Sequence, residues 1–385
     1  MKNNVETVYL SLGSNLGNRA FILQQALFKI EEQTGTIVAI SPVYASEAWG
    51  FQGEEFLNLC IALETSLPPR DLLNLLLSIE KDLGRTRLDD SGYSSRTLDI
   101  DILYYGDLTL QDDPLIIPHP RMEARAFVLR PLADIAPQLY HPVTNKDSRN
   151  LLQACKDKSL LRKTALKLHR NYLDFFSELG FLAIEGNIGS GKTTLATQIS
   201  ERMNAKLILE RFADNPFLPK FYEDRTRYAF PLEMSFLADR YQQYIEDTSQ
   251  LDLFTNFMVS DYDIYKSLIF AKITLQEDEF KLYRRLFGLM YSEVQKPRLY
   301  VYLYQQTDQL LAQIARRGRS YEQGIPSEYL EDIHRGYFDF MRNSPDLPAV
   351  IIDLKGRDFV ANPEDYQWVL ERMCEYVLSE TRLVI

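Results

Sequence analysis

The segment FLAIEGNIGSGKTTL, residues 181–195, constrains the fold of this chain more than any other part of the sequence. An apolar run precedes G-x-x-x-x-G-K-[ST], whose glycines let backbone N–H groups surround phosphates at the N-terminus of a helix. Lys192 would reach the β- and γ-phosphates, and Thr193 would ligate Mg²⁺. The segment therefore predicts a strand, a loop and a helix that bind a nucleoside triphosphate, with a chance match in a strand-to-helix turn as the alternative. The residues expected to bind ATP are Gly186, Asn187, Gly189, Ser190, Gly191, Lys192, Thr193 and Thr194.

Five apolar runs in the second half of the chain follow the pattern of strands in a parallel sheet. Long stretches with helical spacing separate them, which is typical of a sheet covered by helices on both faces. Together with the glycine loop of residues 186–193, they predict an α/β domain of the P-loop type with a five-stranded parallel sheet. The runs lie at residues 181–185, 206–210, 256–260, 299–304 and 349–353.

Two further features of this half point to chemistry on a bound phosphate donor. Glu210 ends the predicted second strand, at the carboxyl edge where open α/β sheets bind ligands. A carboxylate there can take the proton of an attacking hydroxyl. Arg316, Arg317 and Arg319 lie in a predicted loop after a helix, where basic residues can close over a transferring phosphate. A solvated basic turn is the alternative for these arginines.

The first half of the chain also begins with a strand, a glycine-containing turn and a helix. The sequence VYLSLGSNLGNR covers residues 8–19, and a helical pattern follows it. Short β-like runs then alternate with helical patterns, a mixture that predicts an α+β domain. The β-like runs lie at 8–12, 37–44, 56–63 and 97–104, and the helical patterns at 20–32 and 69–82.

The stretch SRTLDIDILYYG, residues 95–106, carries two acidic residues on one face of a predicted strand. Alternate side chains of a strand share a face, so Asp99 and Asp101 point away from Leu98, Ile100 and Ile102. Adjacent carboxylates repel one another unless water or a cation separates them, and Mg²⁺ bridges carboxylates to phosphates. Flanking arginines can chelate phosphate oxygens. The alternatives are a solvated strand face and salt bridges between these arginines and the aspartates.

The sequence predicts two domains joined by a helix. A length of 385 residues is typical of two or three domains. The segment 162–180 has apolar residues at helical spacing and ends on a glycine, which is a helix-stop signal. We expect a first domain over residues 1–160, a helical linker over 161–178 and a second domain over 179–385.

Charge and cysteine content limit the partners and the compartment. The chain has 43 basic and 54 acidic residues, a formal net charge of −11, which disfavours binding to nucleic acid. The cysteines Cys60, Cys155 and Cys374 fit neither a disulfide framework nor a zinc site and favour a reducing compartment. The sequence has neither a signal-peptide core nor a membrane-length apolar run. We expect a cytoplasmic protein with small-molecule substrates and no membrane partner.

Several long motifs of the first half, in collinear order over roughly residues 6–160, resemble 6-hydroxymethyl-7,8-dihydropterin pyrophosphokinase of folate biosynthesis. They are SLGSNLGNR, FLNLCIALETSL, IEKDLGR, SRTLDIDILYYG and PHPRMEARAFVLRPLADIAP. The resemblance implies a ferredoxin-like α+β fold and transfer of pyrophosphate from ATP to the pterin hydroxymethyl group, with release of AMP. Asn58 would hydrogen-bond the pterin edge, and Phe56 and Phe127 would sandwich its ring.

This resemblance also implies residues for the phosphate chemistry. Asp99 and Asp101 would hold two Mg²⁺ ions. Arg85 and Arg96 would stabilise the charge of the migrating pyrophosphoryl group, a catalytic role. The residues implied in contacts with ATP are Glu80, Arg87, His119 and Arg125.

The second half resembles the deoxynucleoside kinase family, specifically its bacterial deoxyguanosine/deoxyadenosine kinase branch. The similar strings are IEGNIGSGKTTLA, LERFADNPFLPKFYED, PLEMSFLADRYQQ, VSDYDIYKSLIFAKITL and IARRGRSYE. The resemblance implies that Glu210 is the general base for the sugar 5′-hydroxyl and that Tyr222 meets the 3′-hydroxyl. Arg316 and Arg319 would belong to a lid, and one Mg²⁺ would bind here. It also implies a homodimer formed through this half.

Two departures from the family pattern bear on the acceptor. Many eukaryotic members place a glutamine against the base, where this chain has Glu233, with Arg240 further along. A carboxylate only accepts hydrogen bonds, so it suits the adjacent N1–H and N2–H donors of guanine and favours deoxyguanosine. The acid–arginine pair of the E-R-S motif reads S-D-Y at residues 260–262. Lys266, Arg240 or a lid residue would then compensate for the missing arginine.

Together these features favour a bifunctional kinase with two ATP sites and two unrelated acceptors. The alternative is an active pterin pyrophosphokinase fused to a nucleotide-binding regulatory module that lacks turnover. Loss of the P-loop lysine or of the base would favour that alternative, but Lys192 and Glu210 are both present. A purely structural scaffold disagrees with two intact phosphate-binding constellations.

Overall fold

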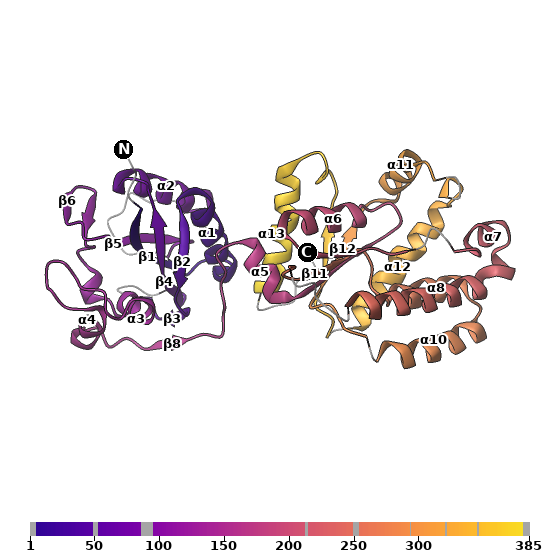
Figure 1. Ribbon diagram of the computed structural model, residues 1–385, viewed down its shortest axis with the longest axis horizontal. Helices are drawn as coiled ribbons and strands as arrows, with labels where there is room; N and C mark the ends of the chain where they lie inside the picture. The colour runs from indigo at the N-terminus through magenta and orange to yellow at the C-terminus, as the bar shows by residue number, and fades with distance from the viewer. Residues whose placement is uncertain are drawn as a thin grey trace. The chain divides into compact units, whose positions relative to one another are not determined.

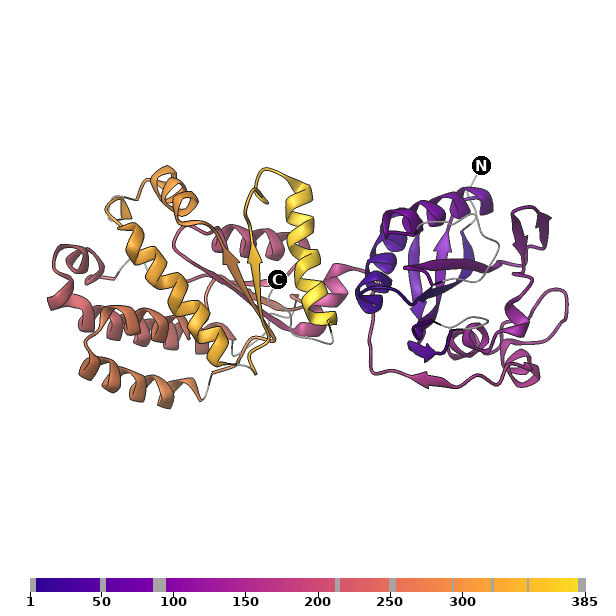
Figure 2. The same cartoon turned by 180° about the vertical axis from the view of Figure 1, so that it is seen from behind.

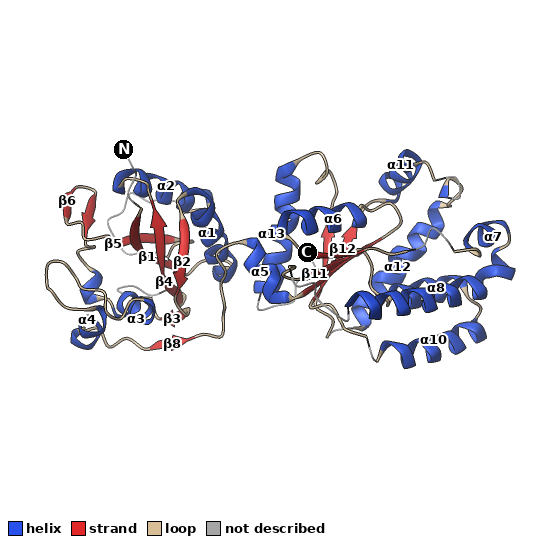
Figure 3. Cartoon of the chain, in the orientation of Figure 1, coloured by secondary structure: helices blue, strands red, loops and turns tan. Residues whose placement is uncertain are grey.

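The computed structural model describes residues 5–48, 53–85, 95–211, 215–248, 254–292, 294–319, 322–344 and 346–379. The chain divides into two compact units, Met1–Phe175 and Phe176–Ile385. Each unit contains helices and strands of its own (Figure 1, Figure 3). None of the helices in the described part of the chain has the length and apolar character needed to cross a bilayer.

The first unit is an antiparallel sheet flanked by helices, which confirms the expected α+β class. The strand order is β5-β1-β4-β3-β8, and β2 pairs with β4 outside this path. The strands are β1 (Glu6–Ser14), β2 (Thr36–Ile40), β3 (Tyr44–Ser46), β4 (Phe56–Thr65), β5 (Asp99–Tyr105) and β8 (Leu161–Lys163), and β6 (Leu110–Asp112) and β7 (Leu115–Ile117) form a separate hairpin. The helices are α1 (Arg19–Gln33), α2 (Pro69–Asp82), the 3₁₀ turn η1 (Met122–Ala124), α3 (Ala126–Ile135) and α4 (Ser148–Ala154).

The register of three strands places the acidic pair beside a glycine. Gly13 of β1 lies opposite Asn58 of β4 on one side and opposite Asp99 of β5 on the other. A Cβ atom at Gly13 would lie 3.1 Å from Asn58 Oδ1. The small residue therefore leaves space at the sheet surface where these side chains meet.

The β-like run 37–44 forms two strands instead of one. Both β2 and β3 pair with β4, and the chain leaves the ladder at Ser41 and Pro42. Proline has no N–H to donate, which interrupts a strand. The Ser41 hydroxyl accepts a hydrogen bond from Cys60 N at 2.9 Å and so replaces one bond of the ladder.

The helical linker predicted over 161–178 is wrong for most of its length. Residues Leu161–Lys163 form β8, an edge strand that pairs with β3, and helix α5 spans only Tyr172–Leu179. The Thr164 N–H continues the pairing by donating to Val43 O at 2.9 Å. The free backbone edge of β3 determines this structure, because it offers hydrogen bonds that the apolar spacing of 162–171 does not reveal.

The second unit is built on the five-stranded parallel sheet that the sequence predicts, in the order β10-β11-β9-β12-β13. Its strands are β9 (Phe181–Gly186), β10 (Lys206–Ile208), β11 (Met258–Ser260), β12 (Leu299–Tyr304) and β13 (Ala349–Asp353). Its helices are α6 (Lys192–Met203), α7 (Leu218–Glu223), α8 (Arg225–Thr248), α9 (Lys266–Thr274), α10 (Glu277–Tyr291), α11 (Thr307–Arg317), α12 (Ser327–Asn343) and α13 (Pro363–Leu378).

Helices cover both faces of this parallel sheet (Figure 1, Figure 2). On one face, Phe181 and Ala183 of β9 pack into apolar clusters with α8, α9 and α12. Helices α6 and α13 contact the strands of the sheet as well. The central strand β9 leads directly into the glycine loop and α6, so the loop lies at the carboxyl edge of the sheet.

Candidate active sites

A cavity in the first unit brings together residues of strands β1, β3, β4 and β5 and helix α3. It contains most of the side chains that the sequence predicts for pyrophosphate transfer and pterin binding. Its lining residues are Ser11, Gly13, Ser46, Glu47, Phe56, Asn58, Arg96, Asp99, Asp101, Arg125 and Phe127.

Asp99 lies between two arginines at the edge of this cavity. Its Oδ1 is 2.7 Å from Arg85 Nη1, and its Oδ2 is 2.8 Å from Arg96 Nη1. As predicted from strand alternation, Ile100 is buried on the opposite face. The salt bridges that the sequence allowed as an alternative therefore exist at Asp99, and they hold both arginines beside the cavity.

Asp101 has weaker ion-pair contacts than Asp99. Its Oδ2 lies 3.6 Å from Arg125 Nη1 and 3.8 Å from His119 Nε2. Burial, together with repulsion from Asp99, raises the pKa of Asp101 to about 6. Burial and the nearby Arg125 lower the pKa of His119 to about 4, so this imidazole is neutral at pH 7.

The aspartate pair fits a Mg²⁺ site. Mg²⁺ typically binds one or two protein carboxylates and takes its remaining ligands from water and substrate phosphates. Asp99 and Asp101 share one face of β5, and their side chains keep 26% and 31% of their surface exposed. A cation between them would remove the repulsion that raises the pKa of Asp101.

The residues expected to contact ATP do not all line this cavity. Arg125 lines the cavity, whereas Glu80 is buried in α2, where its Oε1 accepts a hydrogen bond from Ile100 N at 2.7 Å. Glu80 also pairs with Arg85 and so positions the arginine that contacts Asp99. Arg87 lies outside the described residues.

The pterin-binding prediction concerns aromatic and amide side chains of the same cavity. Phe56 and Phe127 both line it, and Asn58 is almost fully buried. Asn58 Nδ2 donates to Ser46 Oγ at 2.9 Å, which fixes the orientation of the amide. Ser46 was not predicted, because only the pairing of β3 with β4 places it opposite Phe56 and near Asn58.

The cavity of the second unit lies at the carboxyl edge of the parallel sheet. Its walls are formed by the glycine loop and by acidic, basic and aromatic side chains. Its lining residues are Ile188, Gly189, Lys192, Thr193, Glu210, Leu218, Phe221, Tyr222, Leu232, Glu233, Phe236, Arg240, Asp261, Lys266, Phe270, Arg317, Arg319, Glu322 and Tyr329.

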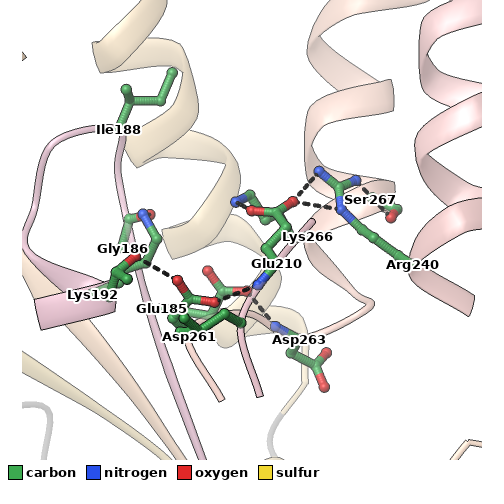
Figure 4. A network of polar contacts seen from close by, with 12 residues as sticks. Glu185, Gly186, Ile188, Lys192, Glu210, Arg240, Asp261, Asp263, Lys266 and Ser267 are labelled. Carbon is green, nitrogen blue, oxygen red and sulfur yellow. Dashed lines mark hydrogen bonds and ion pairs between the residues drawn. The ribbon is translucent and has the colours of Figure 1, made fainter. Parts of the chain in front are cut away.

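The glycine loop has the backbone geometry of a phosphate cradle. Gly186, Gly189 and Gly191 have φ angles of 155°, 83° and 90°, which favour glycine. Lys192 Nζ donates to the carbonyl oxygens of Gly186 at 3.0 Å and Asn187 at 2.8 Å (Figure 4). Burial and the nearby Lys266 lower the pKa of Lys192 to about 8, so it remains mainly charged at pH 7.

The other predicted loop residues face away from the acceptor cavity. Ser190, Gly191 and Thr194 line a neighbouring cavity together with Arg316 and Phe359. The Asn187 side chain donates to Leu330 O at 2.7 Å and so connects the loop to α12.

Thr193 and Asp261 provide oxygen atoms beside Lys192. Thr193 Oγ1 donates to Asp261 Oδ2 at 2.5 Å, and Asp261 Oδ1 accepts from Glu210 N at 2.8 Å. A hydroxyl and a carboxylate at a phosphate loop fit a hard cation such as Mg²⁺. The motif predicts Thr193, but Asp261 was noted only as part of the altered E-R-S motif.

Glu210 is paired with two cations. Its Oε1 accepts from Arg240 Nε at 2.8 Å and Nη2 at 2.6 Å, and its Oε2 accepts from Lys266 Nζ at 2.7 Å (Figure 4). Burial alone would raise the pKa of Glu210, but Lys266 and Arg240 outweigh burial and hold this pKa well below its ordinary value. Glu210 is therefore a carboxylate at neutral pH.

Aromatic residues and Glu233 form the end of the cavity between α8 and α9. Phe236 and Phe270 line it, and the Arg240 guanidinium carbon lies 4.7 Å from the centre of the Phe236 ring. Glu233 Oε1 lies 2.9 Å from Thr274 Oγ1. Tyr222 of α7 lines the same cavity.

The arginine cluster differs from the predicted loop. Helix α11 continues through Arg317, and neighbouring residues of a helix point about 100° apart. Arg316 and Arg317 consequently line different cavities: Arg316 lines the neighbouring cavity and Arg317 the acceptor cavity. Arg319, which follows the helix, also lines the acceptor cavity, and both Arg317 and Arg319 contact Glu322 there.

Comparison with known proteins assigns each of the two units to a protein family. The family model described as 7,8-dihydro-6-hydroxymethylpterin-pyrophosphokinase matches residues 9–137, and the model described as deoxynucleoside kinase matches residues 182–378. The chain belongs to both families. It therefore combines a pterin pyrophosphokinase with a deoxynucleoside kinase, and both use ATP.

Two relatives, one for each unit, agree with this assignment. A deoxyguanosine kinase of Bacillus subtilis is 36% identical over 203 residues, covering 51% of this chain and 98% of that protein. A 2-amino-4-hydroxy-6-hydroxymethyldihydropteridine pyrophosphokinase of Porphyromonas gingivalis is 44% identical over 138 residues, covering 35% of this chain and 93% of that protein. A solved structure of deoxyadenosine kinase from M. mycoides with bound dATP covers 50% of this chain and 98% of its own, with 22% identity and a TM-score of 0.44.

Proposed function

We propose that the deoxynucleoside kinase unit phosphorylates the 5′-hydroxyl of deoxyguanosine in preference to other deoxynucleosides. The observation that carries this proposal is Glu233, which is only 3% exposed and lines the acceptor cavity. Among the described residues, its Oε2 has no hydrogen-bond partner. A buried acceptor needs a donor, and guanine offers N1–H and N2–H side by side. The similarity to a deoxyguanosine kinase supports the same preference.

Glu210 would act on the 5′-hydroxyl at the other end of this cavity. A carboxylate has about four lone-pair sites, and Arg240 and Lys266 supply three N–H contacts, which leaves capacity for the substrate hydroxyl. Glu210 would orient this hydroxyl and accept its proton. Tyr222 would contact the 3′-hydroxyl. Lys266 and Arg240 would together compensate for the arginine that the E-R-S motif lacks.

The phosphate donor would lie between the glycine loop and the arginines. Lys192, Arg317 and Arg319 would stabilise charge on the transferring phosphoryl group. Arg316 would contact the donor nucleotide from the neighbouring cavity, beside Ser190 and Thr194. One Mg²⁺ would be held by Thr193 and Asp261, where it neutralises phosphate charge.

In the pterin pyrophosphokinase unit, Asp99 and Asp101 would hold two Mg²⁺ ions. Arg85 and Arg96, which pair with Asp99, would stabilise the migrating pyrophosphoryl group. Phe56, Phe127 and Asn58 would bind the pterin, and pyrophosphate transfer from ATP would release AMP. Arg125, His119, Glu80 and Arg87 would serve the ATP side, directly or by positioning other residues.

A pair of variants tests the independence of the two sites. Asp101→Asn should reduce pterin pyrophosphorylation by about 10²-fold or more and leave deoxynucleoside phosphorylation unchanged, and Lys192→Ala should do the reverse. A folded variant that lost both activities would contradict independent sites. If the wild-type protein phosphorylated no deoxynucleoside, the second unit would instead be a regulatory module.

Competition among deoxynucleosides tests the acceptor. With equimolar deoxyguanosine, deoxyadenosine and deoxycytidine at pH 8, we expect the deoxyguanosine product to predominate. Equal phosphorylation of deoxycytidine would exclude the preference.

We also propose a homodimer through the kinase unit and a cytoplasmic location. Sedimentation of the full chain tests the first. Cys60, Cys155 and Cys374 are buried free thiols, which supports a reducing compartment.

A further inference from the structure

The hydroxyl group of Thr274 limits the hydrogen bonds that Glu233 can receive. Its hydroxyl lies 2.9 Å from Glu233 Oε1 and 2.9 Å from Phe270 O, the carbonyl one turn earlier in α9. A hydroxyl has one hydrogen but can also accept. If Thr274 donates its hydrogen to Phe270 O, it has none left for Glu233 Oε1, and the carboxyl group then lacks a hydrogen-bond donor that would favour its charged form. The site therefore accommodates a carboxylic acid as well as a carboxylate.

Arg240 does not neutralise Glu233 through a hydrogen bond. Its Nε and Nη2 contact Glu210, and its Nη1 donates to Ser267 Oγ at 2.9 Å. All three nitrogens of the guanidinium thus point to other residues. Burial, only partly opposed by the charge of Arg240, raises the pKa of Glu233 to about 7.

Near neutral pH, the protonation state does not change in three other groups that face Glu233, namely Arg240, Tyr283 and Tyr329. Arginine is always charged, and burial raises the pKa values of the tyrosines Tyr283 and Tyr329 further above their ordinary value. Glu233 is thus the group whose charge changes at this end of the cavity. The titratable groups facing it are Arg240 of α8, Lys266 of α9, Tyr283 of α10, Tyr329 of α12 and Tyr222 of α7.

We propose that Glu233 selects the nucleobase by its protonation state, which gives this one site a second class of substrate. As a carboxylate it accepts two hydrogen bonds and binds guanine through N1–H and N2–H. As a carboxylic acid it presents one donor and one acceptor, like a carboxamide. It then matches adenine or cytosine, each of which pairs an exocyclic N–H donor with a ring nitrogen acceptor. This inference rests on the proposed contact between Glu233 and the base.

The selection has a simple quantitative signature. Guanine requires the ionised form and adenine the neutral form, so the ratio of their kcat/KM values follows the ratio of carboxylate to acid. That ratio changes about tenfold for each pH unit. Groups that act on the sugar or the phosphates, such as Glu210 and Lys192, affect both substrates alike and cancel in the ratio. The preference for deoxyguanosine should therefore weaken as the pH falls.

The experiment measures kcat/KM for deoxyguanosine and deoxyadenosine with the full chain and saturating ATP from about pH 6 to about pH 8. We expect the ratio to rise by about 10²-fold across this range. Glu233→Gln, which has the same shape but no titratable proton, should give a ratio that favours deoxyadenosine and does not depend on pH. Glu201→Gln, at an exposed site on α6, serves as the matched control and should retain the wild-type ratio at each pH.

The outcomes separate this inference from the proposed function. A wild-type ratio independent of pH would overturn selection by protonation, and a changed preference in Glu233→Gln would then still support the contact with the base. A Glu233→Gln protein that kept both the wild-type preference and its pH dependence would overturn the contact as well. The wild-type profile alone decides the inference if Glu233→Gln fails to fold.

Discussion

At the residue scale, Glu210 shows how a buried carboxylate is kept charged in the kinase unit. It accepts hydrogen bonds from Arg240 on α8 and Lys266 on α9, so two helices position one side chain. Removing one partner of a buried ion pair leaves charge uncompensated, which typically costs about 3–5 kcal/mol. The two cations also determine the pH range over which Glu210 can accept a proton.

Replacing Lys266 by methionine should move the acid limb of deoxynucleoside phosphorylation to higher pH. Lys266 is the first of the cations that hold the pKa of Glu210 low, so its loss raises that pKa. The fraction of ionised Glu210 then decreases as the pH falls through the new value. Below this new pKa we expect kcat/KM to fall about tenfold for each pH unit.

The measurement is the profile of kcat/KM against pH for both proteins. Lys272→Met, at an exposed lysine of the same helix, should retain the wild-type profile. If Lys266→Met had the wild-type acid limb and remained folded, Lys266 would not control the ionisation of Glu210.

Local patterns predicted some site residues, and tertiary pairing determined the others. Asp99 and Asp101 follow from strand alternation, and Lys192 follows from a motif whose parts are adjacent in sequence. The contact of Asp261 with Thr193 depends instead on the neighbouring positions of β9 and β11. The orientation of Arg317 depends on where α11 ends, which sequence patterns predict only to within a few residues.

At the element scale, the connection from β9 to α6 requires backbone conformations that side chains disfavour. Gly186 has a φ angle of 155°, and a Cβ atom there would lie 2.7 Å from Leu303 O, a backbone atom of the neighbouring strand. The loop therefore stays close to β12 only because this residue has no side chain. Substitution must displace either the loop or the strand.

Gly186→Ala should consequently destabilise the kinase unit and weaken ATP binding. We expect a loss of about 1–3 kcal/mol in the free energy of unfolding, measured by thermal or denaturant unfolding. Gly288→Ala is the control, and it should change the free energy of unfolding in the opposite direction, because Gly288 lies in α10 with nothing within 4 Å of the added Cβ. It should stabilise the same unit by about 0.5–1 kcal/mol. Equal stability of both variants would refute this account of the loop.

The elements that the sequence predicted well are those whose own residues determine them. The buried strands of the parallel sheet are continuous apolar runs, and the structure has a strand at each of them. Strand β8, with the sequence LRK, lacks such a signal and exists because β3 offers an edge. Edge strands of this kind depend on the partner more than on their own composition.

At the scale of the whole molecule, each unit has its own sheet and its own buried core. In the first unit, Leu129 and Leu132 of α3 pack with Cys60 and Leu103 of the antiparallel sheet. In the second, Leu237 and Tyr244 of α8 belong to a cluster that includes Phe181 of the parallel sheet. A unit with its own core can unfold cooperatively by itself.

We therefore expect calorimetry of the full chain to show two unfolding transitions that respond to different ligands. A ligand at about one hundred times its Kd adds about 2.7 kcal/mol to the stability of the unit that binds it. In a unit of 150–250 residues this raises Tm by about 5–10 °C. Deoxyguanosine should shift only the transition that Gly186→Ala lowers, and 6-hydroxymethyl-7,8-dihydropterin with a nonhydrolysable ATP analogue should shift the other. A single transition shifted by either ligand would mean that the two units unfold as one cooperative structure, and binding at one site would then stabilise the other.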